Sequence, residues 1–104
     1  HWHIIKEAQK KGSKVVVIDS YASRTAKEAD WHVCPKPGTD GALAMAMINV
    51  IIEEGLMDQD YVDNYTVGFQ ELAERAKERS PEWAEKITGI SARNIFKSFL
   101  FFLA

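Results

Sequence analysis

The sequence predicts an α/β fold in which a partial Rossmann-like parallel sheet of two strands is followed by a helical C-terminal extension. Three observations favour it. A continuous β-branched run over residues 15–18 is typical of a strand covered on both faces in a parallel sheet. A shorter strand candidate follows at residues 31–34. From residue 41 onward the chain carries helical patterns, so the strands come early and the helices late.

In the first half of the chain, each expected element has a clear end. Residues 1–12 predict an amphipathic helix, and Gly12 suits the position just after its last turn. Asp19 ends the first strand, and the polar residues 20–30 can hold one or two helical turns. Pro35 closes the second strand, so the order becomes helix, strand, short helix, strand.

The second half is predicted to be helical throughout. Asp40 is expected to N-cap a helix that is apolar nearly all round, and such a helix is usually buried. Gly55 can stop that helix. The further helices are expected from Asp58 to about Tyr65, from Phe69 to about Arg79, from Glu82 to Thr88 with Ser80 as N-cap and Pro81 as first residue, and from Ala92 onward.

Composition excludes several classes of function. The chain has 104 residues, with 13 Lys and Arg against 15 Asp and Glu, which argues against sequence-independent binding of nucleic acid. Its one cysteine excludes an internal disulfide, a four-cysteine zinc site and a cysteine quartet for an iron–sulfur cluster. No run reaches the ~20 apolar residues of a membrane span, and the first residues do not resemble a secretory signal.

The end of the first strand is a candidate ligand site. In open α/β sheets, ligands bind beyond the carboxyl ends of the strands, where an acidic residue commonly accepts hydrogen bonds from ribose hydroxyls. Asp19 has that place. It is equally consistent with an ordinary polar strand terminus.

A second candidate follows the second strand. Gly38 lets backbone approach a ligand closely, and Thr39 supplies a hydroxyl. Asp40 can accept two parallel hydrogen bonds from the ring and exocyclic nitrogens of guanine, which adenine cannot match; the plain alternative is that Asp40 is only an N-cap. A Gly-rich dinucleotide fingerprint and a P-loop lysine are both absent from the sequence, which disfavours a simple dinucleotide or ATP site.

Two His and Cys pairs invite a metal interpretation that we reject. His1 and His3 lie at i and i+2 on a helix, where side chains diverge by roughly 200°. The pair His32 and Cys34 shares one face of a strand, but Cys34 has no base or cation near it in sequence, and we predict a buried, inert thiol.

Several separated blocks, in order, resemble one family. They are K-V-V-V-I-D, P-G-T-D-G-A-L-A-M-A-M, I-I-E-E-G-L-M-D and Y-T-V-G-F-Q-E-L, with S-P-E-W-A-E-K-I-T-G-I extending the match to about residue 90. The sequence is similar in these blocks to the molybdopterin oxidoreductases of the dimethyl-sulfoxide-reductase and formate-dehydrogenase type. Agreement in several blocks is more specific than agreement in any one of them.

The resemblance implies a role for the two strand ends. The family uses two molybdopterin guanine dinucleotides around one molybdenum, and the resemblance implies that this region holds the guanosine end of one of them. Members often have Pro-Arg where this chain has Ser20 and Tyr21, so this chain lacks the arginine at that position. The predicted cofactor-binding residues are Asp19, Ser20, Tyr21, Ser23, Arg24, Gly38, Thr39 and Asp40, with no catalytic residue and no metal ligand in this chain.

The resemblance also implies a larger parent. We expect residues 1–104 to be a fragment of a catalytic subunit, with residues 1–56 as the α/β part of the cofactor-binding domain and residues 57–104 as the helical extension. The parent would catalyse two-electron redox or oxygen-atom transfer, with a four-iron cluster and electron-transfer subunits as further expectations. The fragment alone is expected to be inactive, and both cytoplasm and periplasm stay open as its compartment.

The alternative from a different class is a non-catalytic helical interaction module. The C-terminal sequence is apolar from Phe99 to Leu103, and such a run suits a partner surface. Under this hypothesis the chain self-associates through the segment from Phe96 to Leu103.

Overall fold

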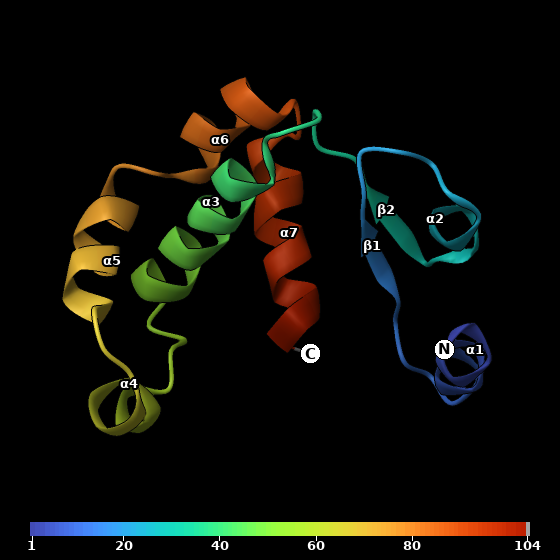
Figure 1. Cartoon of the computed structure of the whole chain (residues 1–104), viewed down its shortest axis with the longest axis horizontal. Helices are drawn as coiled ribbons and strands as arrows, with labels where there is room; N and C mark the ends of the chain where they lie inside the picture. Colours follow the sequence, from blue (N-terminus) through green and yellow to red (C-terminus); the bar gives the residue numbers. More distant parts are fainter. Residues whose placement is uncertain (104) are drawn as a thin grey trace.

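The helices and strands lie close to the positions that the sequence predicts. The computed structural model describes the backbone of residues 1–103 and the side chains of residues 1–100. Figure 1 shows the elements in chain order. They are α1 (Trp2–Lys10), β1 (Val16–Ile18), α2 (Arg24–Glu28), β2 (Trp31–Val33), α3 (Asp40–Glu53), α4 (Gln59–Tyr65), α5 (Phe69–Lys77), α6 (Pro81–Thr88) and α7 (Ala92–Leu103).

Strands β1 and β2 pair in parallel, with Val17 opposite His32 and Ile18 opposite Val33. The α2 crossover between them gives the chain room to return to the start of the sheet, as parallel pairing requires. The predicted mixture of helices with a parallel sheet is therefore confirmed. The expected cover on both faces is wrong for β1, since Ile18 is 38% exposed. Within residues 1–103 the sheet consists of β1 and β2, and α2 is the described helix that packs substantially against β1, so Ile18 stays partly open.

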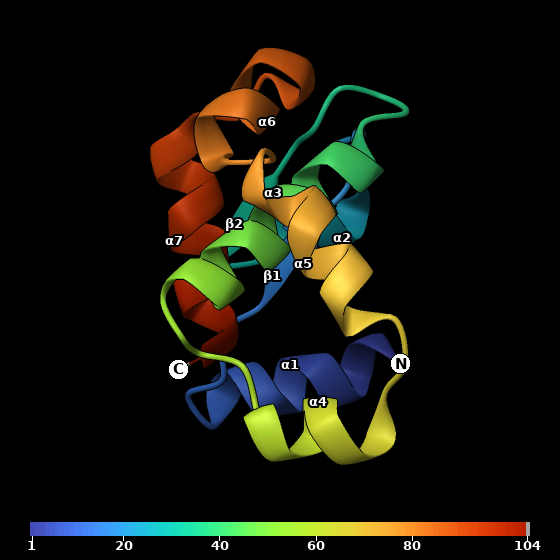
Figure 2. The ribbon, with the colours of Figure 1, turned by 90° about the vertical axis from the view of Figure 1, so that its left-hand side faces the viewer.

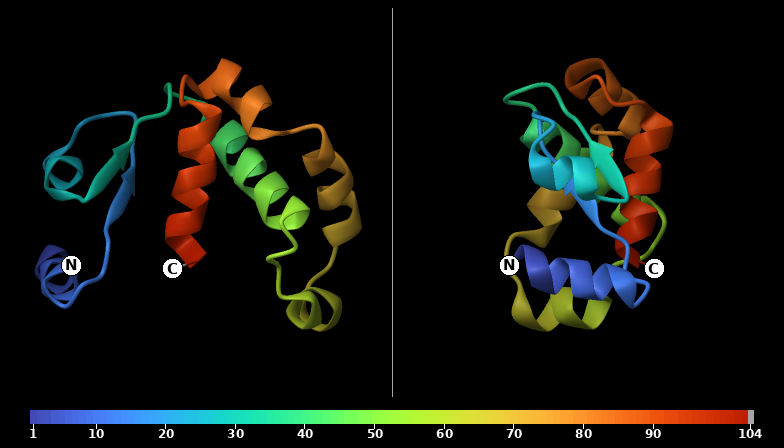
Figure 3. Two further views of the ribbon diagram at one scale, coloured as in Figure 1. Left: turned by 180° about the vertical axis from the view of Figure 1, so that it is seen from behind. Right: turned by 90° about the vertical axis from the view of Figure 1, so that its right-hand side faces the viewer.

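The later helices gather on one side of the sheet, away from α1 and α2 (Figures 1 and 3). Helix α3 contacts α5, α6 and α7, and Figure 2 shows α5 lying across α3. The core they share with β2 is apolar, and burial of such side chains is the main favourable contribution to folding. Its buried members are Val33, Leu43, Ala46, Ala84, Ile90 and Ile95.

Helix α3 is the central element of this helical part, and the prediction that it is buried is confirmed along one side. Leu43, Ala46 and Val50 are buried, whereas its other apolar residues are half-buried or exposed. Asn49 is buried as well, and its Nδ2 donates a hydrogen bond of 2.9 Å to the carbonyl oxygen of Ala76 at the end of α5. The polar side chain is therefore satisfied and holds α5 to α3.

Helix α6 begins and ends as expected. The Ser80 hydroxyl accepts from the backbone N–H of Trp83, and Pro81 is the first helical residue. Gly89 follows the helix with φ of 76°, a left-handed conformation that glycine adopts at little steric cost.

Helix α1 is joined to the strands by the carboxylate of Asp30, which precedes β2. Its Oδ2 accepts hydrogen bonds from Gln9 Nε2 at 2.9 Å and from the backbone N–H of Val15 at 2.8 Å. Lys14 Nζ lies 3.7 Å from its Oδ1. These contacts from α1 and from the residue before β1 converge on one side chain.

The start of the C-terminal apolar run belongs to the core. Phe99 is 2% exposed, so this residue packs inside the molecule instead of forming a partner surface, while Leu100 is 45% exposed. The side chains from residue 101 onward, which the self-association hypothesis includes, lie outside the described residues. None of the described helices has the length and apolar character needed to cross a membrane.

Replacing Ile95 by Ala tests the shared core. Ile95 is fully buried, and the change should lower the free energy of unfolding by about 2–5 kcal/mol because it removes buried methyl groups and leaves a cavity. Chemical denaturation measures this change. Ile4→Ala is the control, since Ile4 is 74% exposed and should cost no more than about 0.5 kcal/mol. Equal losses in the two variants would contradict the described core.

The Asp30 contacts predict a pH dependence. The hydrogen bond from Gln9, then that from the Val15 N–H, hold the pKa of the Asp30 carboxyl below its ordinary value of 3.8. The stabilisation is therefore complete above about pH 3.8 and is lost as the pH falls through the lower folded-state pKa. The amide signal of Val15, followed by NMR, should titrate with a midpoint below 3.8.

Asp30→Ala should abolish that titration of the Val15 signal, because the carboxylate is then absent. A midpoint above the ordinary value in the unaltered chain would show that these hydrogen bonds do not favour the ionised carboxylate.

Candidate functional site

The two candidate segments leave the sheet at the same edge. Residues 19–24 follow β1, residues 34–40 follow β2, and both loops start at the upper edge of the sheet in Figure 1. The backbone N–H of Asp19 donates to the carbonyl oxygen of Val33 at 3.0 Å, which extends the strand pairing to the beginning of the loops. Parallel pairing thus brings together two strand ends that are separated in the sequence.

The loop after β1 is organised by its own polar groups. Asp19 Oδ1 accepts from the backbone N–H of Tyr21 at 3.0 Å, and the N–H of Ser23 donates to the Tyr21 carbonyl oxygen at 2.8 Å. The Ser23 hydroxyl caps α2 by accepting from the N–H of Ala26. Among the described residues, none donates a hydrogen bond to the second carboxylate oxygen of Asp19.

Three further predicted site residues in this segment face solvent. Tyr21 is 73% exposed, Ser20 is exposed, and the Arg24 side chain is 94% exposed with its Nε 3.5 Å from Glu28. Cys34 is also exposed, which corrects the prediction of a buried thiol. Cys34 follows the last residue of β2 and therefore lies in the exposed loop. Its Sγ is 3.5 Å from the Ser20 carbonyl oxygen.

The loop after β2 is anchored to the helical core. Pro35 is fully buried, and the backbone N–H of Lys36 donates to the carbonyl oxygen of Thr88 at the end of α6, at 2.9 Å. The Lys36 carbonyl oxygen accepts from the Thr39 hydroxyl at 2.6 Å, which closes a turn around Gly38.

The predicted N-cap of α3 is wrong by one residue. Thr39 is the N-cap, and Asp40 is the first helical residue. The Thr39 hydroxyl makes no capping hydrogen bond, and it donates to the Lys36 carbonyl oxygen. The Asp40 carboxylate is exposed and has no hydrogen-bond or ion-pair partner among the described residues.

Gly38 and Asp40 together leave an open approach to the start of α3. Gly38 has φ of 77°, a conformation that suits glycine, and a side chain built at this position would meet no atom within 4 Å. A ligand can therefore reach the backbone here, next to a carboxylate that has no partner among the described residues.

A hollow beside the first turn of α3 was not predicted. Arg79 lies over the Trp83 ring, with 4.6 Å between the guanidinium carbon and the ring centroid. The helical patterns of α3, α5 and α6 do not indicate how these helices pack, so the sequence carried no signal for this hollow. It is lined by Gly41, Ala42, Met45, Arg75, Arg79 and Trp83.

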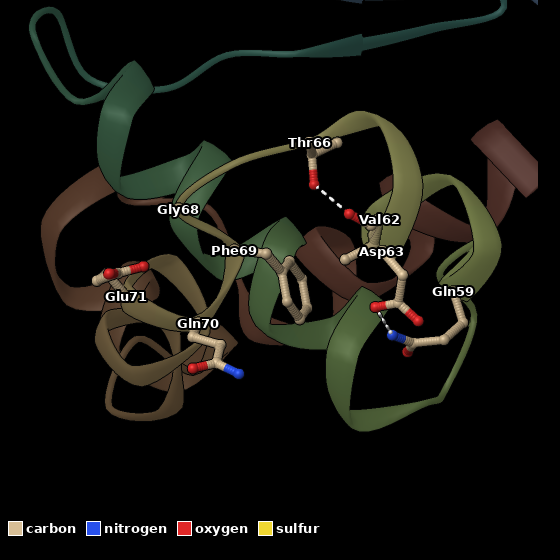
Figure 4. Close-up of a pocket in the computed structure, with 8 residues that line it drawn as sticks. All are labelled: Gln59, Val62, Asp63, Thr66, Gly68, Phe69, Gln70 and Glu71. Carbon is tan, nitrogen blue, oxygen red and sulfur yellow. Dashed lines mark hydrogen bonds between the residues drawn. The ribbon is translucent and has the colours of Figure 1, made fainter.

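A second hollow lies between α4 and α5 and is drawn in Figure 4. Its polar groups are largely bonded within α4 and the residue after it: Gln59 Nε2 donates to Asp63 Oδ1 at 2.7 Å, and the Thr66 hydroxyl donates to the Val62 carbonyl oxygen at 2.7 Å. Figure 4 shows the Phe69 ring beside them, with Gln70 and Glu71 spread along α5. These side chains do not converge on a common point.

Metal ligands do not cluster in the described part of the chain. Among its residues, no group of three or more His, Cys, Asp or Glu side chains could hold a metal ion. The site residues available are therefore carboxylates, hydroxyls, one guanidinium and backbone groups at the two strand ends.

Comparison with known proteins identifies the family. The family model described as molybdopterin oxidoreductase matches residues 1–98. Formate dehydrogenase H of Escherichia coli is 42% identical over 89% of this chain, and the thiosulfate reductase molybdopterin-containing subunit of Salmonella typhimurium is 45% identical over 79% of it. The solved structure of acetylene hydratase from Pelobacter acetylenicus superposes with a TM-score of 0.88, at 40% identity over 97% of this chain.

This chain spans only a small part of each relative: 13% of the formate dehydrogenase, 11% of the thiosulfate reductase subunit and 14% of the acetylene hydratase chain. The names of these three proteins refer to different reactions. The match of the family model over nearly the whole sequence shows that the chain belongs to the molybdopterin oxidoreductase family.

Proposed function

We propose that this chain is part of the catalytic subunit of a molybdenum oxidoreductase and holds the guanosine end of a molybdopterin guanine dinucleotide. The observation that carries the proposal is the exposed Asp40 carboxylate, which has no partner among the described residues and stands beside the open backbone at Gly38. A carboxylate without a protein partner retains all of its acceptor capacity for a ligand.

Asp40 suits guanine in particular. The ring N–H and the exocyclic amino group of guanine are parallel donors on one edge, and the two oxygens of a carboxylate accept both. Adenine presents an acceptor at the ring position, so it cannot form this pair. Hydrogen bonds to a charged acceptor contribute about 1.5–3 kcal/mol, which is enough for a clear preference between the two bases.

The loop after β1 supplies the groups for the sugar and phosphates. The free oxygen of Asp19 can accept from ribose hydroxyls, as acidic residues at strand ends commonly do. Ser20, Tyr21 and Ser23 add hydroxyls, and the exposed Arg24 guanidinium can bind a phosphate oxygen. Thr39 contributes less, because its hydroxyl hydrogen is already donated to Lys36.

The donor and acceptor set thus fits a guanine nucleotide. The molybdenum centre of the bound cofactor would supply the two-electron or oxygen-atom chemistry. This chain's residues bind and orient one end of the cofactor, and its catalytic residues and any four-iron cluster would come from the rest of the parent.

In the parent, residues 1–56 would form the α/β part of the cofactor-binding domain and residues 57–104 its helical extension. The β1–β2 pair would then belong to a wider Rossmann-like sheet that the rest of the chain completes, and electron-transfer subunits would be the parent's further partners. The helical interaction module is not favoured, because the chain belongs to an oxidoreductase family and Phe99 is buried in its own core.

The Asp40→Asn variant tests the guanine contact. The unaltered chain should bind GMP more tightly than AMP. In the variant, an NH2 donor stands where the carboxylate has one of its two acceptor oxygens. The ratio of GMP affinity to AMP affinity should therefore fall by about tenfold or more. Titration of each nucleotide, followed by NMR or calorimetry, measures the ratio.

Glu54→Gln is the matched control for this experiment, because it removes an exposed carboxylate just after the far end of the same helix. It should leave the GMP to AMP ratio unchanged. Equal binding of GMP and AMP by the unaltered chain would refute the proposed contact.

A further inference from the structure

We infer that His32 is a positioning residue for the nucleotide site. Its side chain holds the backbone of Asp19, and one carboxylate oxygen of Asp19 stays free for the ligand. This inference rests on the proposed function, since it concerns how the same site is kept in shape. His32 is not one of the residues proposed above to bind the nucleotide.

The geometry places His32 at the edge where the loops begin. It lies on β2 opposite Val17, one register position before the strand ends. Its Nε2 is 2.7 Å from the carbonyl oxygen of Asp19. A carbonyl oxygen only accepts hydrogen bonds, so Nε2 carries the hydrogen and donates it. The ring is half-buried, which limits competition from water.

Cys34 provides a second, weaker tie on the same side of the sheet. Residues two apart on a strand face the same way, and the Cys34 thiol donates to the carbonyl oxygen of Ser20 at 3.5 Å. Two consecutive carbonyl groups of the loop are thus held by side chains from β2 and the residue that follows it.

With the His32 contact, three hydrogen-bonding groups of Asp19 have a partner within the chain. Its N–H donates to Val33, its carbonyl oxygen accepts from His32, and its Oδ1 accepts from the Tyr21 N–H. The backbone and one side-chain oxygen are therefore fixed, and the remaining oxygen is the group left to a ligand. A site that is already ordered loses less conformational entropy on binding, which raises affinity without adding a contact.

Three variants test this role in the full chain. His32→Phe keeps a ring but removes the donor, whereas His32→Gln places an amide N–H at a reach similar to that of Nε2. His3→Phe is the control, since His3 is exposed on α1 and has no hydrogen-bond partner among the described residues. The measurements are GMP affinity, the midpoint of thermal unfolding, and the position of the Tyr21 amide signal in the ligand-free chain.

We expect His32→Phe to weaken GMP binding by about three- to tenfold, the loss that one hydrogen bond produces, and to shift the Tyr21 amide signal. His32→Gln should restore both towards the unaltered chain, and His3→Phe should change neither. A loss of affinity in His32→Phe that follows only from a lower unfolding midpoint, with no rescue by Gln, would overturn the inference.

The outcomes separate this inference from the proposed function. If the unaltered chain binds GMP and His32→Phe binds it equally well, the positioning role is wrong and the proposed function stands. If the unaltered chain shows no preference for GMP, the proposed function is wrong, and the Tyr21 signal alone then decides whether His32 holds the loop. An unchanged Tyr21 signal in His32→Phe would overturn the role in either case.

Discussion

The parallel pairing of β1 with β2 is the constraint on which the rest of this structure depends. It sets Ile18 opposite Val33, so that the loops after both strands start at the same edge. The same pairing fixes the sheet to the helices, because Val33 is buried among Leu43, Ala46 and the other core residues. If the register slipped by one residue, Val33 would turn its side chain away from that core. The positions of both candidate loops therefore follow from the register of the β1–β2 pair.

The two loops are held by different means, and this difference matters for binding. The loop after β1 depends on side chains of its strand neighbour, through His32 and Cys34. The loop after β2 is joined to the helical part through the Lys36 N–H and buried Pro35. In both cases the hydrogen bonds engage backbone groups, while one oxygen of Asp19 and the Asp40 carboxylate have no partner among the described residues. The chain thus presents acceptors on a fixed frame, as a site for hydrogen-bond donors requires.

Local sequence signals predicted the elements well but not their surroundings. Ser80 with Pro81 specified where α6 begins, because side-chain capping is a contact within a few residues. The N-cap of α3 was misplaced by one residue because Thr39 and Asp40 both suit that position, and only the backbone conformation decides between them. The burial of β1 and the exposure of Cys34 depend on which elements pack against them. The residue pattern of a single strand does not indicate those neighbours.

The same limit applies to the site. The sequence predicted both strand ends as binding segments, and the structure shows that they share one edge of the sheet. It did not predict the hydrogen bond from His32 to the Asp19 backbone, because that contact depends on the register of two strands. A histidine on a strand looks the same in the sequence whether it faces a loop carbonyl or solvent.

We propose that the two strand ends form one guanine nucleotide site, which a map of backbone amide shifts on adding GDP can test. We expect the shifts to concentrate at residues 19–24 and 38–40, with AMP producing smaller changes there. Shifts confined to residues 96–100, or equal shifts with both nucleotides, would contradict a guanine site at the strand ends.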